Sequence, residues 1–283
     1  MPTDLPYCDH VLEERDRERP ADRPGPRHIH WGYWTRPDRP GVSGTGVQEA
    51  TDQMVREHWP LALLGPGRRV LDVGCGMGGT LALVDRAFAG QTLVGVNIDP
   101  RQIRVARSEV VSTNGNRIEF EVADACRLPF RDGTFDTVFA VECIFHFSSR
   151  ETFLAEANRV LRPGGRLVFS DLVVTRIPPL LRPLARMALR IRLGRLAAAT
   201  RRFYGKGSAV THSAYLALLA SAGFTFLECR DVTPHVMPNH EAARGWAAEV
   251  SADFNASARY LEALTKMRLL RYRLYALEKP VRA

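Results

Sequence analysis

One stretch decides the fold class: Val70-Leu71-Asp72-Val73-Gly74-Cys75-Gly76-Met77-Gly78-Gly79-Thr80. The apolar run over residues 69–73 predicts a buried strand, and the periodic segment over 80–88 predicts a helix. The glycines between them allow a tight turn and let a ligand approach the backbone, because glycine has no Cβ. A strand, a glycine turn and a helix in this order are typical of the first unit of a nucleotide-binding α/β domain.

Strand and helix patterns alternate downstream of this unit. Further strands are expected at residues 92–98, 118–123, 134–141, 166–170, 224–231 and 268–278. Helices are expected at 47–59, 101–112, 152–161, from 211 to about 222, and over most of 241–266. The pattern predicts an α/β fold, with a doubly wound, Rossmann-like, mostly parallel sheet of seven strands and helical cap segments.

Several ordered motifs resemble those of class I S-adenosylmethionine (SAM) methyltransferases. They are Asp72-x-Gly74-x-Gly76-x-Gly78, Gly95-Val96-Asn97-Ile98, Ala123-Asp124-Ala125, Phe135-Asp136 and Leu161-Arg162-Pro163-Gly164-Gly165. Three further segments, at 28–34, 142–147 and 170–172, are similar to small-molecule methyltransferases of natural-product pathways, such as the rebeccamycin sugar O-methyltransferase. The resemblance covers roughly residues 65–175 and implies a SAM-dependent methyltransferase.

The same resemblance implies which residues bind SAM. The turn of Gly74, Cys75, Gly76 and Gly78 is expected to hold the amino-acid end of the cofactor, and Asp72 to support its amine. The remaining expected cofactor contacts are Asn97 at the ribose, Ile98 on the adenine, Asp124 and Ala125 at the adenine nitrogens, and Gln102. Asn97 departs from the acid that the family most often has, and whether Asp99 replaces that acid is left open.

His146 and Asp171 are the candidate catalytic residues. They follow neighbouring expected strands, so both are predicted to reach the same edge of the sheet, where an Asp that orients a His makes a general base. The alternative for His146 is a packing role between two phenylalanines. His30, Trp31 and Tyr33 are expected to form a lid over cofactor and substrate, or else to fasten the N-terminal arm. The remaining histidines share no metal spacing, and no metal site is predicted.

Two regions are expected along the 283 residues. Residues 1–60 form an N-terminal arm and helical lid, with the first 27 residues largely disordered. Residues 61–283 form the SAM-binding methyltransferase domain, with a basic helical cap insert at about 172–211. That insert has no acidic residue and more positive charge than the whole chain, whose formal net charge is +8. Its basic residues are Arg176, Arg182, Arg186, Arg190, Arg192, Arg195, Arg201, Arg202 and Lys206.

The expected function is methyl transfer to a small secondary-metabolite acceptor, at a hydroxyl oxygen. The alternatives are C- or N-methylation of a small, anionic or isoprenoid-like metabolite, an RNA-modifying protein suggested by the pI of 9.6, and a non-catalytic SAM-binding protein. No nucleic-acid partner is expected, since no base-amine methylase motif follows the fourth strand. The insert is read as a cap over the substrate pocket, with membrane-surface contact as an alternative. A cytoplasmic location is expected because no signal peptide or apolar span is visible. Acceptor identity and oligomeric state are left open.

Overall fold

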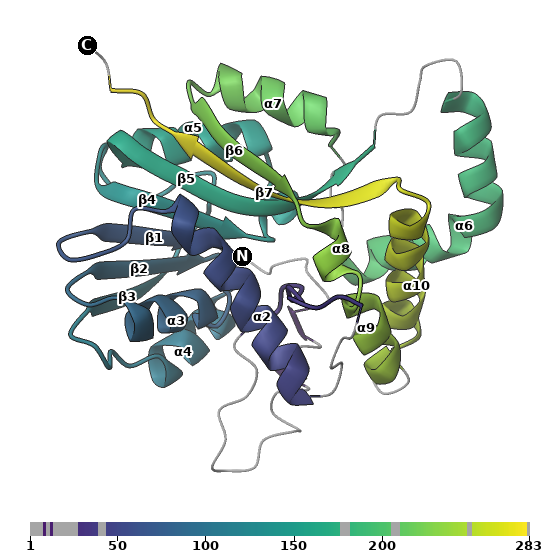
Figure 1. Ribbon diagram of the computed structural model, residues 1–283, viewed down its shortest axis with the longest axis horizontal. Helices are drawn as coiled ribbons and strands as arrows, with labels where there is room; N and C mark the ends of the chain where they lie inside the picture. Colours follow the sequence, from purple (N-terminus) through teal and green to yellow (C-terminus); the bar gives the residue numbers. More distant parts are fainter. Residues whose placement is uncertain are drawn as a thin grey trace.

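A seven-stranded sheet forms the centre of the computed structural model, which describes residues 8–9, 12–13, 28–38, 44–175, 182–204, 210–247 and 251–281 (Figure 1). The strands are β1 (Arg69–Val73), β2 (Thr92–Asn97), β3 (Arg117–Val122), β4 (Phe135–Val141), β5 (Leu161–Val174), β6 (Thr225–Asp231) and β7 (Leu270–Glu278). Their order is β3-β2-β1-β4-β5-β7-β6. Strands β1 to β5 pair in parallel, and β7 is antiparallel to both β5 and β6. The predicted mostly parallel, seven-stranded sheet is confirmed.

Helices cover both faces of this sheet. They are α2 (Gly44–His58), α3 (Gly79–Ala87), α4 (Pro100–Glu109), α5 (Arg150–Val160), α6 (Arg182–Tyr204), α7 (His212–Ser221), α8 (Thr233–Val236), α9 (Asn239–Ala247) and α10 (Ala252–Lys266), with 3-10 turns η1 (Trp59–Leu61) and η2 (Ile144–His146). The apolar sides of α3 and α4 pack on one face of the sheet, and those of α5 and α7 pack on the other. Two buried cores therefore sandwich the strands, as the hydrophobic periodicity predicts.

Strand β5 is longer than predicted. It begins at Leu161 and continues to Val174, because Leu172, Val173 and Val174 pair with β7. The segment expected to begin the basic insert at residue 172 is therefore sheet. Residues 182–204 of the insert form one helix, α6, which packs against α10 (Figure 1). Pro183 lies in the first turn of α6, where proline is tolerated. Residues 176–181 and 205–209 lie outside the described residues, as does most of the N-terminal arm.

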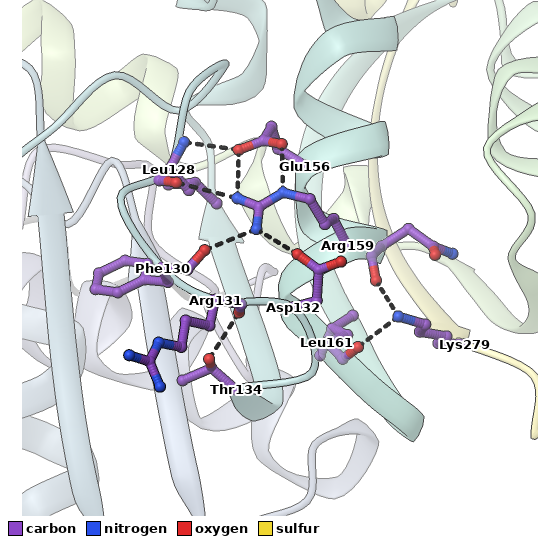
Figure 2. Close-up of polar contacts among 10 residues, drawn as sticks. Leu128, Phe130, Arg131, Asp132, Thr134, Glu156, Arg159, Leu161 and Lys279 are labelled. Carbon is purple, nitrogen blue, oxygen red and sulfur yellow. Dashed lines mark hydrogen bonds and ion pairs between the residues drawn. The ribbon is translucent and has the colours of Figure 1, made fainter.

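Arg159 on α5 holds the chain between β3 and β4 in place through polar contacts (Figure 2). Its guanidinium donates to the carbonyls of Leu128 and Phe130 at 3.0 and 2.7 Å and pairs with Asp132 at 2.8 Å. Glu156 completes the network, since it binds both this guanidinium and the backbone N–H of Leu128. Each polar group in this network has a protein partner, which identifies it as structural.

Candidate active site

A cavity of about 300 Å³ lies at the carboxyl edge of the sheet. Strand β1 lies between β2 and β4, so the chain moves outward in opposite directions from this point. Such a switch point is where open α/β sheets bind ligands. Its wall consists of residues 72–76 and 79–80, 97–99 with Gln102, 123–125, 141–143 and 145–148, together with Cys8 and residues 28–31.

The glycines of the turn have different tasks. Gly76 has φ of 55°, and a Cβ there would meet nothing closer than Gln102 Oε1 at 3.7 Å. Gly74, with φ of 73°, abuts Cys143, and a Cβ would approach its side chain to 2.8 Å. Gly78 does not line the cavity. It lies directly before α3, and a Cβ there would meet Phe120 at 2.8 Å, so its described role is packing.

Asp72 is a buried carboxyl with one oxygen free. The side chain is 1% exposed, and Oδ2 has no hydrogen-bond partner within the described residues. Burial raises the pKa of Asp72 to about 8, and a hydrogen bond with Thr80 offsets only part of this effect. A positively charged group placed beside Oδ2 would restore the ionised form.

Asn97 and Gln102 meet across the end of β2. Asn97 Nδ2 donates to Gln102 Oε1 at 3.0 Å, and its Oδ1 accepts from the backbone N–H of Asp99 at 3.0 Å. Asp99 caps α4 and binds the backbone and guanidinium of Arg101 at 2.9 and 2.8 Å. Burial pushes the pKa of Asp99 up, but the bonds from Arg101 outweigh it and hold the pKa below its usual value. Asp99 lines the cavity, yet its carboxylate is already bound to Arg101.

The other expected cofactor contacts also lie in the wall. Ile98 is 43% exposed, unusually high for its type, and it faces the cavity beside Ala125, which is buried. Asp124 lines the cavity, and its Oδ1 also accepts a hydrogen bond from the backbone N–H of Cys126 at 2.8 Å, which stabilises the turn after β3. Cys75 is buried in the turn, and burial raises its pKa, which leaves an unreactive thiol.

His146 reaches the cavity, but Asp171 does not. Burial lowers the pKa of His146 to about 4, so the ring is neutral at physiological pH. Asp171 is fully buried, with Oδ2 bound to Arg150 at 3.2 Å and to the Tyr215 hydroxyl at 2.9 Å. The described contacts do not bring the predicted His146–Asp171 pair together: β5 continues past Asp171, and its carboxyl binds Arg150 on α5 and Tyr215 on α7 instead of lining the cavity.

Residues 28–31 form the part of the cavity wall that contacts α2. His30 Nδ1 lies 3.0 Å from the Trp31 carbonyl and its Nε2 lies 3.1 Å from His28 Nδ1, while His28 Nε2 contacts Asp52 on α2 at 3.2 Å. Burial lowers the pKa of His30 to about 3, and both ring nitrogens are engaged. His30 therefore shapes the wall and fastens the segment.

Trp31 and Tyr33 diverge from this segment. Trp31 lines the cavity, stacks on Tyr272 with centroids 6.0 Å apart and meets His240 edge-on at 5.0 Å. Tyr33, expected in the lid, stacks instead on His235 at 4.2 Å and does not line the cavity. In a regular strand, successive residues point to opposite faces and residues 31 and 33 would share one face, but this segment is not a strand.

Several wall residues were not predicted as site residues, among them Cys8, Glu142, Phe145 and Phe147. The three after β4 have a sequence signal, because they flank His146 where a strand ends at the ligand-binding edge. Cys8 has none, since its Sγ reaches Gln102 Nε2 at 3.1 Å through a contact 94 residues apart in the chain.

Comparison with known proteins identifies the family. The family described as "Methyltransferase domain" matches residues 71–169. An "O-methyltransferase" of Pyrenophora dematioidea is 32% identical over 74% of this chain and 73% of its own length, and the 27-O-demethylrifamycin SV methyltransferase of Amycolatopsis mediterranei is 31% identical over 75% and 72%. The chain is a class I SAM-dependent methyltransferase. Methyltransferase GfsG of Streptomyces halstedii is 38% identical over about half of each chain (52% and 51%).

The fold of this methyltransferase matches solved structures over most of its length. Geranyl diphosphate methyltransferase in complex with SAM superposes with a TM-score of 0.70 at 20% identity, covering 90% of this chain and all of that one. The cofactor of the family fits the observed wall. Gly76 leaves open space at the turn, and the free Oδ2 of Asp72 suits the ammonium group of SAM.

No helix among the described residues is long and apolar enough to cross a membrane. Within the same residues, no group of three or more His, Cys, Asp or Glu side chains is placed to hold a metal ion.

Proposed function

We propose that this methyltransferase methylates a hydroxyl oxygen of a small natural-product acceptor. The observation that carries the proposal is His146, a buried neutral imidazole in the wall of the cavity that the glycine turn also lines. The relatives from Pyrenophora dematioidea and Amycolatopsis mediterranei, whose names refer to O-methylation or to an O-demethylated substrate, support the same chemistry. A closer likeness to sugar O-methyltransferases stays a prediction.

SAM supplies a methyl carbon activated by its sulfonium, so an S–CH₃ bond is exchanged for an O–CH₃ bond and one proton is released. His146 accepts that proton at an imidazole nitrogen. Even a weak base serves here, because a hydroxyl oxygen that gains the methyl group becomes a positively charged oxygen with three bonds, and its proton is then strongly acidic. Phe145 and Phe147, which flank His146 in the cavity wall, exclude water from the reacting atoms.

The cofactor is held by the residues of the switch point. Asp72 binds the ammonium group beside the backbone of Gly74, Cys75 and Gly76. We assign Asn97 with Gln102 to the ribose hydroxyls, Ile98 to the adenine face, and Asp124 and Ala125 to the adenine nitrogens. Residues 28–31 close the acceptor side, within an arm and lid of residues 1–60, and α6 serves as a cap on the domain of residues 61–283.

A labelled-methyl assay tests the proposal. The purified protein is incubated with [methyl-¹³C]SAM and a panel of hydroxylated polyketides, phenols and amines, and NMR locates the transferred carbon. We expect an O–CH₃ product, and His146→Gln should lower kcat by roughly 10²–10⁴-fold with unchanged affinity for S-adenosylhomocysteine (SAH). His212→Gln makes the same change outside the cavity and should be neutral.

Other outcomes separate the alternatives. Label on carbon or nitrogen, with His146→Gln fully active, would move the assignment to C- or N-methylation. Label found only in added RNA would favour a nucleic-acid substrate. SAM binding with no transfer to any member of the panel would contradict the O-methyltransferase proposal.

A further inference from the structure

Glu142 occupies a strained position in the cavity wall. It is the first residue after β4, with φ of 51°, and Arg268 is the only other non-glycine among the described residues with positive φ. Its backbone N–H donates to the Ser170 carbonyl at 3.1 Å, which fixes the strained turn. A glycine would adopt this conformation without cost, so the strain indicates that the position requires the side chain.

One carboxyl oxygen of Glu142 is fully engaged. Oε2 accepts from the backbone N–H of Trp31 at 2.9 Å and from the Tyr272 hydroxyl at 2.7 Å, and Ser170 Oγ lies 3.1 Å from that hydroxyl. Within the described part of the chain, no hydrogen bond reaches Oε1. Two donors from separate segments therefore orient the carboxyl through Oε2. Oε1 remains available for a hydrogen bond, and the side chain lines the cavity.

Holding Trp31 and Tyr272 in place does not by itself require a carboxyl at position 142. The amide oxygen of a glutamine would accept the same two bonds without burying an acid. Burial raises the pKa of Glu142 to about 8 despite both bonds, so the ionised group is under-solvated. A donor from a bound molecule would complete its hydrogen bonding. The surrounding wall is aromatic, formed by Trp31, Phe145 and Phe147, with His146 four residues further along the chain.

We propose that Glu142 binds the methyl acceptor, with Oε1 accepting a hydrogen bond from a second hydroxyl that is not itself methylated. The preferred acceptors then carry two neighbouring hydroxyls on an apolar or aromatic frame. This inference rests on the proposed function, because it names the acceptor class of the same cavity. Glu142 selects and orients the acceptor, and His146 receives the proton.

Binding of catechol and phenol to the SAH complex tests this role without requiring methyl transfer. The two probes differ by one hydroxyl, and calorimetry at pH 7 gives their dissociation constants. The wild-type complex should bind catechol up to about tenfold more tightly than phenol, the effect of one added hydrogen bond. Glu142→Ala should bring the ratio close to one. Glu142→Gln, which keeps the bonds to Trp31 and Tyr272, should give an intermediate ratio.

Glu151→Gln provides the matched control, because it makes the same change on an exposed residue outside the cavity. Its ratio should equal that of the wild type. If Glu142 only fastens the N-terminal segment, both probes weaken together and their ratio persists, which overturns the proposal. Wild-type protein that binds neither probe, or both equally, overturns it as well.

The two proposals fail in distinguishable ways. A ratio that depends on Glu142, with no O–CH₃ product in the labelled-methyl assay, would leave acceptor binding by Glu142 standing and reject the O-methyltransferase function. An O–CH₃ product, together with a catechol-to-phenol affinity ratio that does not depend on Glu142, would support the O-methyltransferase function and reject acceptor binding by Glu142. If Glu142→Ala lacks the wild-type circular dichroism spectrum, Glu142→Gln alone decides.

Discussion

Asp72 and Asp171 are buried aspartates on two strands of one sheet, yet their surroundings differ. Asp171 on β5 is fully buried, and its two oxygens accept bonds from Arg150, Tyr215 and the backbone N–H of Leu172. Asp72 on β1 is equally inaccessible but keeps Oδ2 without a partner among the described residues. Burial alone therefore does not identify an acid that binds a ligand. The feature that identifies it is a buried carboxyl oxygen without a hydrogen-bond donor from the protein.

The opposite edge of the sheet repeats the pattern of Asp171. Asp136, near the start of β4, pairs with Arg68 and Arg162 at 2.9 and 2.6 Å and accepts from the backbone N–H of Arg69 at 2.8 Å. Arg159 is similarly saturated (Figure 2). Incompletely bonded acids, Asp72 and Glu142, gather instead at the carboxyl edge that forms the cavity.

The largest effect is expected from removing the guanidinium that pairs with Asp171. Arg150→Met leaves the Asp171 carboxyl buried without its cation and should lower the free energy of unfolding by about 3–5 kcal/mol. Urea denaturation followed by circular dichroism measures the loss. A variant of wild-type stability that has lost turnover would instead return Asp171 to the catalytic role predicted from the sequence.

A smaller effect is expected from pH. The pKa values of Asp72 and Glu142 are raised to about 8, so the folded state holds protons that the unfolded state has released. Stability from these groups is complete below the unfolded pKa, near 4, and is lost as pH rises through 8. Three histidines with pKa values lowered to about 3–4 have the opposite effect: His30, His58 and His146. Their contribution to the stability of the folded state grows as pH rises to about 6.5.

Stability of the cofactor-free protein should therefore peak near pH 6–7 and decline by on the order of 2 kcal/mol toward pH 8.5. Denaturation at a series of pH values measures the curve. The double variant Asp72→Asn, Glu142→Gln should lose the alkaline decline and keep the acid one. An alkaline decline that survives in this variant would show that other groups cause it.

The sequence predicts the sheet well because its strands are short apolar runs separated by glycine, proline and capping residues. Thr211, for example, lies at the start of the helix expected from residue 211, and its side chain caps α7 by accepting a hydrogen bond from the Ala214 N–H. Most of the expected cofactor-binding residues could be proposed in the same way, because the family motifs lie where the predicted strands end. Asp171 could not be placed, because the length of β5 depends on its pairing with β7, almost 100 residues later. Cys8 and the strained turn at Glu142 likewise depend on contacts between distant segments.

The affinity of Asp72→Asn for SAH tests the central claim most directly. If the free oxygen of Asp72 holds the ammonium group of the cofactor, calorimetry at pH 7.5 should show binding weakened about tenfold or more. The cofactor-free variant should be at least as stable as the wild type, because it no longer buries an acid. Asp136→Asn, as the control, should lose stability and keep its SAH affinity. Wild-type SAH affinity in Asp72→Asn, or a loss of stability like that of Arg150→Met, would contradict the account.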